Sequence, residues 1–331
     1  MSSDQRTATP RPAGVTAASV AEQPAGAPRR PRIGPPRWQT LRALKGAAFA
    51  APFLLGFLFV FVLPVGYAVH ESLFTERSSG LGIGGQERVF VGLDNLTRGL
   101  GDGAFWTSML RVLLFACVQI PVMLGLALLM ALLLDTLATR TAHRFRLAFL
   151  IPYMIPGVVA ALMWMYLYSP RLGPLTDVLG TLGVDADFYA SEMLWVSLGN
   201  LLTWHGVGYN MLIIYGALLA VPRELFDAAR VDGASELRIA LRIKVPFVRG
   251  ALVLTGMLSI IGMLQIFNEP LLFRQVAPET VTKNYTPILM IYHQAFDAND
   301  YHYAAALSII LALVVGAVSL VFYKLTNRQP V

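Results

Sequence analysis

The sequence is poor in cysteine and in charge, and both shortages narrow the kinds of protein it can encode. A single cysteine, Cys117, among 331 residues excludes a disulfide scaffold and any metal or iron–sulfur site built from several thiolates. Charged residues make up 14% of the chain and hydrophobic residues 56%. Because a typical soluble domain carries roughly 25% charged residues, we expect lipid to be the solvent for much of this surface.

Motifs for common catalytic and cofactor sites are also missing. There is no Gly-x4-Gly-Lys-Ser/Thr phosphate loop and no Gly-x-Ser-x-Gly nucleophile elbow, so we predict that the chain itself neither hydrolyses ATP nor acts as a serine hydrolase. None of the five histidines is paired at metal-ligand spacing, and we predict no metal and no cofactor. Residues 80–85 fit Gly-x-Gly-x-x-Gly without a preceding strand, which indicates a flexible turn.

Six apolar stretches are long enough to cross a hydrocarbon core of about 30 Å, which takes roughly 20 helical residues. They cover residues 46–69, 107–134, 147–168, 193–220, 251–273 and 303–325. Pro64, Pro121, Pro152 and Pro156 fall inside them, which membrane helices tolerate where neighbouring groups bond the freed carbonyls. The predicted fold is therefore all-α, a polytopic protein with six transmembrane helices in the lipid bilayer.

Residues 1–45 differ from the rest of the chain. Seven of the 20 prolines and eight of the 26 Lys and Arg residues lie there, with few large aliphatic side chains. Such a segment cannot bury enough apolar surface to offset its loss of conformational entropy. We therefore predict a disordered basic tail over residues 1–45 and one membrane domain over residues 46–326.

The positive charges alternate along the chain. Nineteen of the 26 Lys and Arg residues lie in the two termini and in the connections 135–146 and 221–250, while the connections 70–106, 169–192 and 274–302 hold six. By the positive-inside rule, both termini and the two basic connections are cytoplasmic in a multi-pass membrane protein. The net charge of +6 then reflects topology, and we predict no nucleic-acid partner.

Charge inside the apolar stretches is scarce. His205 is the only ionisable residue near the middle of one, and Glu269 lies at the end of the fifth. This scarcity disfavours an ion-coupled transporter, and a lone histidine is more often structural than a proton relay. Neutral polar side chains do occur, and they predict either contacts between helices or a path for an uncharged polar solute. They are Gln119, Asn200, Thr203, Asn210, Ser259, Gln265 and Asn268.

The connection 221–250 has the pattern of a helix–turn–helix. Pro222 suits a first helical turn, Gly233 can reverse the chain, and Ser235 can cap a second helix that Pro246 brings toward its end. The small apolar faces of these helices could enter a groove on a partner. Periodicity alone is equally compatible with a loop that lies on the lipid headgroups.

These residues resemble the EAA loop of binding-protein-dependent ABC importer permeases. In that family Glu-Ala-Ala is followed by Asp-Gly-Ala and, further on, by Pro. The corresponding residues, which the resemblance assigns to coupling with an ATPase, are Asp227, Ala228, Ala229, Asp232, Gly233, Ala234 and Pro246, with Asp227 one methylene shorter than the usual Glu. Residues 91–95, 151–156 and 303–306 agree with the carbohydrate, MalF/UgpA-like branch.

The resemblance covers roughly residues 46–326 and implies a transmembrane permease subunit of an ABC importer in a bacterial inner or plasma membrane. Such a subunit forms half of the path for a sugar or related polyol, and residues 221–250 couple it to a separate ATPase. The implied partners are a second homologous permease, two ATP-binding subunits and an extracytoplasmic substrate-binding protein. A permease for a sugar phosphate, a peptide or an ion is the alternative within this class, and an ion-coupled secondary transporter the alternative outside it.

The resemblance also assigns residues to the solute path. The positions that line the path in the maltose-type member correspond to Tyr153, Gly157, Leu202, Gly206, Ser259, Met263 and Ile266. Tyr153, Gly206 and Ser259 match that member. The maltose-type member has Ser at the position of Gly157. It has Asn at the positions of Leu202, Met263 and Ile266. The loss of three amides argues against maltose itself as the solute.

Overall fold

The computed structural model describes residues 37–78, 86–137 and 139–326, so most of the predicted tail and the glycine-rich run at 80–85 lie outside the described residues. The described residues divide into two units at Phe59 and Val60. Helix α1 (Arg37–Phe57) belongs to the first unit and begins within the segment expected to be disordered. A π-helical segment, Leu58–Val62, follows it.

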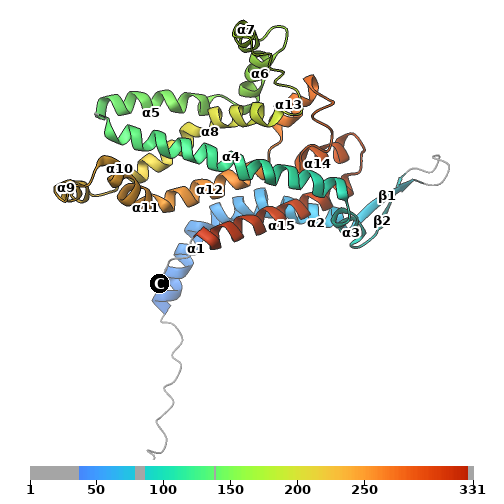
Figure 1. Ribbon diagram of the computed structural model, residues 1–331. Coiled ribbons are helices and arrows are strands. Elements are labelled where there is room, and N and C mark those ends of the chain that lie inside the picture. The colour runs from blue at the N-terminus through green and yellow to red at the C-terminus, as the bar shows by residue number, and fades with distance from the viewer. Residues whose placement is uncertain (1–36, 79–85, 138, 327–331) are drawn as a thin grey trace, which may run out of the picture. The chain divides into compact units, whose positions relative to one another are not determined.

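The second unit is almost entirely helical, and Figure 1 shows its long helices running along one another. Its α-helices in chain order are α2 (Leu63–Ser72), α3 (Asp94–Leu100), α4 (Gly103–Thr136), α5 (Thr139–Met154), α6 (Gly157–Tyr168), α7 (Pro174–Thr181), α8 (Leu194–Leu218), α9 (Arg223–Val231), α10 (Glu236–Ile239), α11 (Val245–Phe247), α12 (Arg249–Leu264), α13 (Asn268–Val276), α14 (Pro287–Phe296) and α15 (Tyr301–Thr326).

Helix α4 is at the centre of the packing, against α8 and α12, while α15 packs against α2, α12 and α14. The fully buried Ala127 and Ala131 of α4 form a cluster with Met211 of α8. Helix α5 crosses α8 at Gly208, where an added Cβ atom would lie 1.8 Å from the carbonyl oxygen of Phe149. Small residues at these positions are what allow the helices to approach closely.

Three helical stretches are long and apolar enough to cross a membrane: Gly46–Ser72, Gly103–Thr136 and Tyr301–Thr326. Two bent helix pairs raise the number to five among the described residues. The predicted fourth stretch is matched by α8, which is 25 residues long but falls outside this set. Its polar side chains, including Asn200, His205 and Asn210, lower its hydropathy.

The third predicted stretch, residues 147–168, is wrong as a single straight helix. Helices α5 and α6 meet at an angle of 91° around Ile155 and Pro156. Proline has no backbone N–H and forces its preceding residue out of the helical region, so the helix ends before it. His205 bonds the exposed carbonyl, with its Nε2 3.0 Å from the Ile155 oxygen.

The fifth predicted stretch, residues 251–273, is also interrupted. Helix α12 ends at Leu264 and α13 begins at Asn268. Pro270 explains the break, because in a continuous helix its ring would meet the carbonyl of Ile266, four residues earlier. That carbonyl instead accepts a hydrogen bond from the Thr286 hydroxyl at 3.3 Å.

A short β-ribbon departs from the all-α prediction. Strands β1 (Phe74–Ser78) and β2 (Gln86–Phe90) pair antiparallel, with Phe74 opposite Phe90. The two aromatic rings meet edge to face with their centroids 5.4 Å apart. The ribbon follows α2 and lies at the end of the bundle opposite α9 and α10 (Figure 1).

Candidate solute cavity and coupling loop

A cavity of about 430 Å³ opens between α4, α5, α8, α12 and the break that follows α12. Its size lies within the roughly 300–1,000 Å³ typical of small-molecule sites. Six of the seven residues predicted to line the solute path lie around it: Tyr153, Leu202, Gly206, Ser259, Met263 and Ile266. Gly157 is not part of the lining but adjoins it, since a Cβ atom there would be 3.7 Å from Glu269 Oε1.

The helix breaks determine much of this lining. The chain between α12 and α13 contributes Gln265, Ile266 and Phe267 in a non-helical conformation. Tyr153 comes from the last turn of α5, just before the bend at Pro156. The cavity therefore lies where two helices end, so that side chains and backbone from both can face it.

One face of α8 supplies lining residues that the resemblance does not assign to the path. His205 and Tyr209 lie beside Leu202 and Gly206 on this face, and Asn210 adjoins them. The rings of Tyr153 and Tyr209 stack with their centroids 4.5 Å apart and their planes 14° from parallel. The signal that could have found Tyr209 is the spacing of 202, 205, 206 and 209, which places these residues on one side of a helix.

Glu269 is the only acidic residue in the lining, and no Lys or Arg lines the cavity within the described part of the chain. His205 Nε2 donates a hydrogen bond to the Ile155 carbonyl. A neutral imidazole can make this bond, so the bond does not require a positive charge on His205. Gln265 and Asn268, which are close to Glu269 in the sequence, add two amide groups to the lining. The lining thus combines two tyrosine rings with amides and one carboxyl group.

The remaining neutral polar residues of the helices connect one helix to another. Gln119 of α4 donates to the Gly199 carbonyl at 2.9 Å and to the Thr203 hydroxyl at 2.7 Å. Asn200 of α8 donates to the Tyr168 hydroxyl at 2.8 Å. These side chains join helices, whereas Ser259, Gln265 and Asn268 line the cavity.

The connection between α8 and α12 contains the two short helices and the turn that the sequence predicts. Helix α9 begins after Pro222, the backbone reverses at Gly233 with φ of +76°, and the Ser235 hydroxyl caps α10. Arg230 holds the two helices together, because its guanidinium bonds Asp227 at 3.0 Å and Glu236 at 2.8 Å. The hydrogen bond from Arg230 lowers the pKa of the Glu236 carboxyl.

Four apolar side chains of this loop are exposed, among exposed charged residues such as Arg223 and Arg238. Leu225, Val231, Leu237 and Leu241 are all exposed, Val231 to 87%. The motif residues Ala228 and Asp232 are exposed beside them, while Ala229 and Ala234 are joined by a backbone hydrogen bond of 2.9 Å. Exposed apolar side chains of this kind are available for contact with another molecule.

A buried ion pair connects the loop to the membrane helices. Lys244 Nζ lies 2.5 Å from Asp135 Oδ2 at the end of α4, and 5.0 Å from the centre of the Phe226 ring of α9. Pro246 follows in the first turn of α11. The sequence did not predict this ion pair, because Asp135 and Lys244 are each among several charged residues in the connections 135–146 and 221–250.

No family model matches the chain, whereas individual relatives do. It is 30% identical over 297 residues to the arabinooligosaccharides transport system permease protein AraP of Bacillus subtilis, with 88% of this chain and 92% of AraP covered. The chain belongs to the carbohydrate ABC importer permeases. The permease is also 27% identical over 297 residues to the lactose transport system permease protein LacF of Rhizobium radiobacter, covering 86% and 95% of the two chains.

A solved structure agrees on the fold. A bacterial ABC transporter involved in the import of the acidic polysaccharide alginate contains a chain that matches with a TM-score of 0.73 at 17% identity, covering 89% of this chain and 99% of that one. The permease is accordingly a multi-pass membrane protein with the ABC importer permease fold. It is a transport subunit and not an enzyme.

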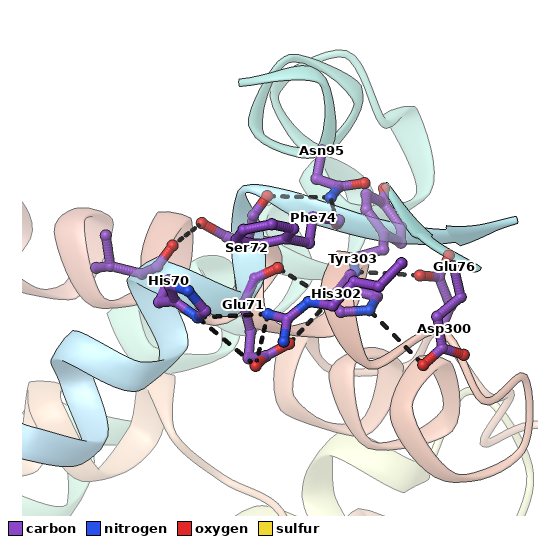
Figure 2. Close-up of polar contacts among 11 residues, drawn as sticks. His70, Glu71, Ser72, Phe74, Glu76, Asn95, Asp300, His302 and Tyr303 are labelled. Atoms are coloured by element: carbon purple, nitrogen blue, oxygen red, sulfur yellow. Dashed lines mark hydrogen bonds and ion pairs between the residues drawn. The ribbon is translucent and has the colours of Figure 1, made fainter. Parts of the chain in front are cut away.

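Two of the three segments typical of the carbohydrate branch, residues 91–95 and 303–306, lie at the end of the permease opposite the loop, where α3 packs against α15 (Figure 1). Asn95 donates to the backbone carbonyls of Ser72 and Phe74, at 3.0 and 2.7 Å, which joins α3 to the end of α2 (Figure 2). His302 Nδ1 lies 3.0 Å from Glu71 Oε2 and joins α15 to the same place. These residues position helix ends and do not line the cavity.

Proposed function

We propose that the permease carries a neutral carbohydrate or polyol through the cavity between α4, α5, α8 and α12. The observation that carries this proposal is the convergence of Tyr153, Gly206 and Ser259 on one cavity that also holds a tyrosine stack. Sugars offer hydroxyl groups to amides and carboxylates and an apolar ring face to aromatic side chains. The cavity supplies both kinds of contact.

The charge of the lining favours a neutral sugar over the sugar-phosphate alternative. A phosphate would need Arg, Lys or helix N-termini as partners. No Arg or Lys lines the described cavity, and Glu269 lies in the first turn of α13, where its carboxyl group would repel a phosphate at that helix N-terminus. One relative, UgpA of Salmonella typhimurium, is named for sn-glycerol-3-phosphate transport and is 29% identical over 288 residues, so family membership alone does not decide between these solutes.

Substitution at Gly206 tests the path. An added Cβ atom there would lie 3.1 Å from Met123 Sδ, and a larger side chain would extend into the cavity. We expect Gly206→Trp to abolish uptake by the assembled importer. Gly216→Trp is the matched control, because Gly216 lies on the same helix with no neighbouring atom within 4 Å of an added Cβ. Normal uptake by Gly206→Trp would remove this cavity from the path.

We further propose that the permease has six spans with both termini in the cytoplasm, and that residues 221–250 couple it to the ATPase. The distribution of Lys and Arg supports this orientation, and the exposed leucines of α9 and α10 supply a surface for a partner. Six spans require α8 to cross together with the two bent pairs. Closure of the ATPase pair would move the turn around Gly233 and, through Lys244, the end of α4.

The coupling role can be tested with Asp227→Lys and Gly233→Pro. The first places a second positive charge beside Arg230, and the second forbids the φ of +76° at the turn. Both variants should insert in the membrane and lose substrate-stimulated ATP hydrolysis in the purified complex. Arg238→Gln, an exposed change on α10 outside the motif, is the control. Unaltered stimulated hydrolysis in both variants would contradict the coupling role.

The proposed assembly contains this permease, a second homologous permease, two ATP-binding subunits and an extracytoplasmic binding protein. The alginate transporter has been solved in complex with an alginate pentasaccharide-bound periplasmic protein, with a TM-score of 0.72 to this chain at 17% identity. Co-purification from membranes tests the proposal directly. We expect the ATPase to be retained by the permease and lost when the apolar surface of α9 and α10 is replaced by the double change Leu225→Asp and Leu237→Asp.

A further inference from the structure

A second cavity, of about 500 Å³, lies where α4 ends, α5 begins and α8 ends. Four arginines line it: Arg140, Arg144 and Arg146 of α5, and Arg223 at the start of α9. Figure 1 shows these helix ends at the same end of the bundle as α9 and α10. This arginine pocket plays no part in the proposed solute path.

The positive charge of the arginine pocket is not compensated within the described chain. Its one carboxylate, Asp135, already bonds Lys244 at 2.5 Å. None of the four arginines forms an ion pair with any residue that the structure describes. Arg146 makes only neutral contacts, with His143 Nδ1 at 2.9 Å and the face of the Tyr215 ring at 6.0 Å. Like charges gathered in one cavity repel one another unless an anion from outside the chain joins them.

We propose that the arginine pocket binds the phosphate group of an anionic phospholipid. The pocket lies at the ends of long apolar helices, which is the level of the headgroups, and basic residues clustered there attract anionic lipids. Arginine guanidinium groups match phosphate oxygens in bidentate geometry. Leu137, Tyr215 and Leu219 complete the lining and offer an apolar wall beside the charges.

The neighbouring surface favours lipid over a carboxylate of a protein partner. Leu147 lies three residues after Arg144, on the same side of α5, and Leu147 and the nearby Phe145 are about half exposed, at 51% and 48%. A phospholipid supplies phosphate for the arginines and acyl chain for these side chains, whereas an acidic protein patch supplies only the charge. The predicted tail over residues 1–45 is not a suitable occupant, because its eight Lys and Arg residues outnumber its two acidic residues and the arginines of the pocket would repel it.

Lipid retention by the complete importer tests the arginine pocket. The complex would be reconstituted in nanodiscs of phosphatidylcholine with phosphatidylglycerol, released into detergent, and its bound lipid counted by native mass spectrometry. The test variant is Arg140→Gln with Arg144→Gln, since neither side chain makes an ion pair within the described residues. Arg238→Gln with Arg242→Gln removes the same charge from the neighbouring loop and is the matched control.

We expect wild type and control to retain phosphatidylglycerol in preference to phosphatidylcholine, and the test variant to retain it about thirtyfold less. Equal retention by the test variant would overturn the proposal, and so would equal retention of phosphatidylcholine by the wild type. Displacement of the lipid by inorganic phosphate alone would assign the pocket to a free anion instead. Retention only by a permease stripped of its ATPase would assign the pocket to that protein partner.

Discussion

Lys244 and Asp135 form a buried ion pair, 2.5 Å long, between residues 109 positions apart in the sequence. Their side chains are 7% and 17% exposed, so neither charge is well solvated. The pair joins the segment before α11 to the end of α4, and α4 contributes Met123 to the solute cavity. One continuous helix therefore connects the proposed ATPase contact with the proposed path.

Removing one partner of this pair should destabilise the permease. Asp135→Asn leaves the Lys244 ammonium buried without its carboxylate, which costs about 3–5 kcal/mol for a broken buried pair. We expect a lower melting temperature in thermal unfolding and weaker substrate-stimulated ATP hydrolysis. Lys244→Met with Asp135→Leu should restore the melting temperature, because no charge is then left buried. Glu192→Gln, an exposed change outside the loop, serves as the control, and equal stability of Asp135→Asn and wild type would argue against the pair.

Glu269 should determine both affinity and charge selectivity in the cavity. Glu269→Gln removes a charged acceptor for solute hydroxyl groups, and we expect the KM for uptake to rise about tenfold or more, since hydrogen bonds to charged groups contribute roughly 1.5–3 kcal/mol. Glu269→Lys should abolish uptake of the neutral solute. Glu279→Gln is the control, as Glu279 is exposed and lies outside the cavity. A KM unchanged by Glu269→Gln would exclude a direct contact with the solute.

Gly208 should tolerate no side chain at the crossing of α5 and α8. A Cβ atom would lie 1.8 Å from the Phe149 carbonyl oxygen, which is backbone and cannot rotate away. Gly208→Ala should therefore lower the free energy of unfolding by about 1–3 kcal/mol, as overpacked sites do. The matched change Gly216→Ala on the same helix meets no atom within 4 Å and should be neutral or slightly stabilising. Chemical denaturation of both variants in detergent compares them, and equal stability would show that the helices can separate without penalty.

Asp297 should contribute stability that disappears in acid. Hydrogen bonds from the Lys283 ammonium at 3.0 Å and from the His293 ring at 2.6 Å lower the pKa of its carboxyl group. A carboxyl whose pKa is lower in the folded state stabilises the fold above its unfolded pKa, about 3.9, and loses that contribution as the pH falls through the folded value. The melting temperature of Asp297→Asn should therefore lie below that of the wild type at pH 5. At pH 3 the two melting temperatures should be closer together. Asp185→Asn, an exposed change without such partners, should show no pH-dependent difference from wild type.

Motif positions in the sequence are enough to locate most of the cavity. Tyr153, Leu202, Gly206, Ser259, Met263 and Ile266 are assigned by the resemblance, and they meet around one cavity. Tyr209 was within reach through its helical spacing from Gly206 and His205. Lys244 and Asp135 were not, because a charge in a basic connection carries no sign of which distant residue it faces.

The sequence also did not predict that two of the apolar stretches are broken and change direction. The apolar runs 147–168 and 251–273 continue through Pro156 and Pro270, and hydropathy measures composition without orientation. Proline marks a weak point in a helix, but membrane helices often continue past it when neighbours satisfy the freed carbonyl. His205 and Thr286 bond the carbonyls at the two breaks, and only packing brings them there.

By itself, the sequence determined that lipid is the solvent for much of the surface, that the fold is helical, and that residues 227–246 resemble the EAA loop, because these depend on composition and on residues close together in the chain. It left open whether each neutral polar residue faces a neighbouring helix or a solute. The tertiary structure places Gln119 and Asn200 in contacts between helices and Ser259 and Gln265 at the cavity. The physical reason is that the rotation and breaks of each helix are set by close packing with distant helices, as at Gly208, and such contacts are not encoded in any local pattern.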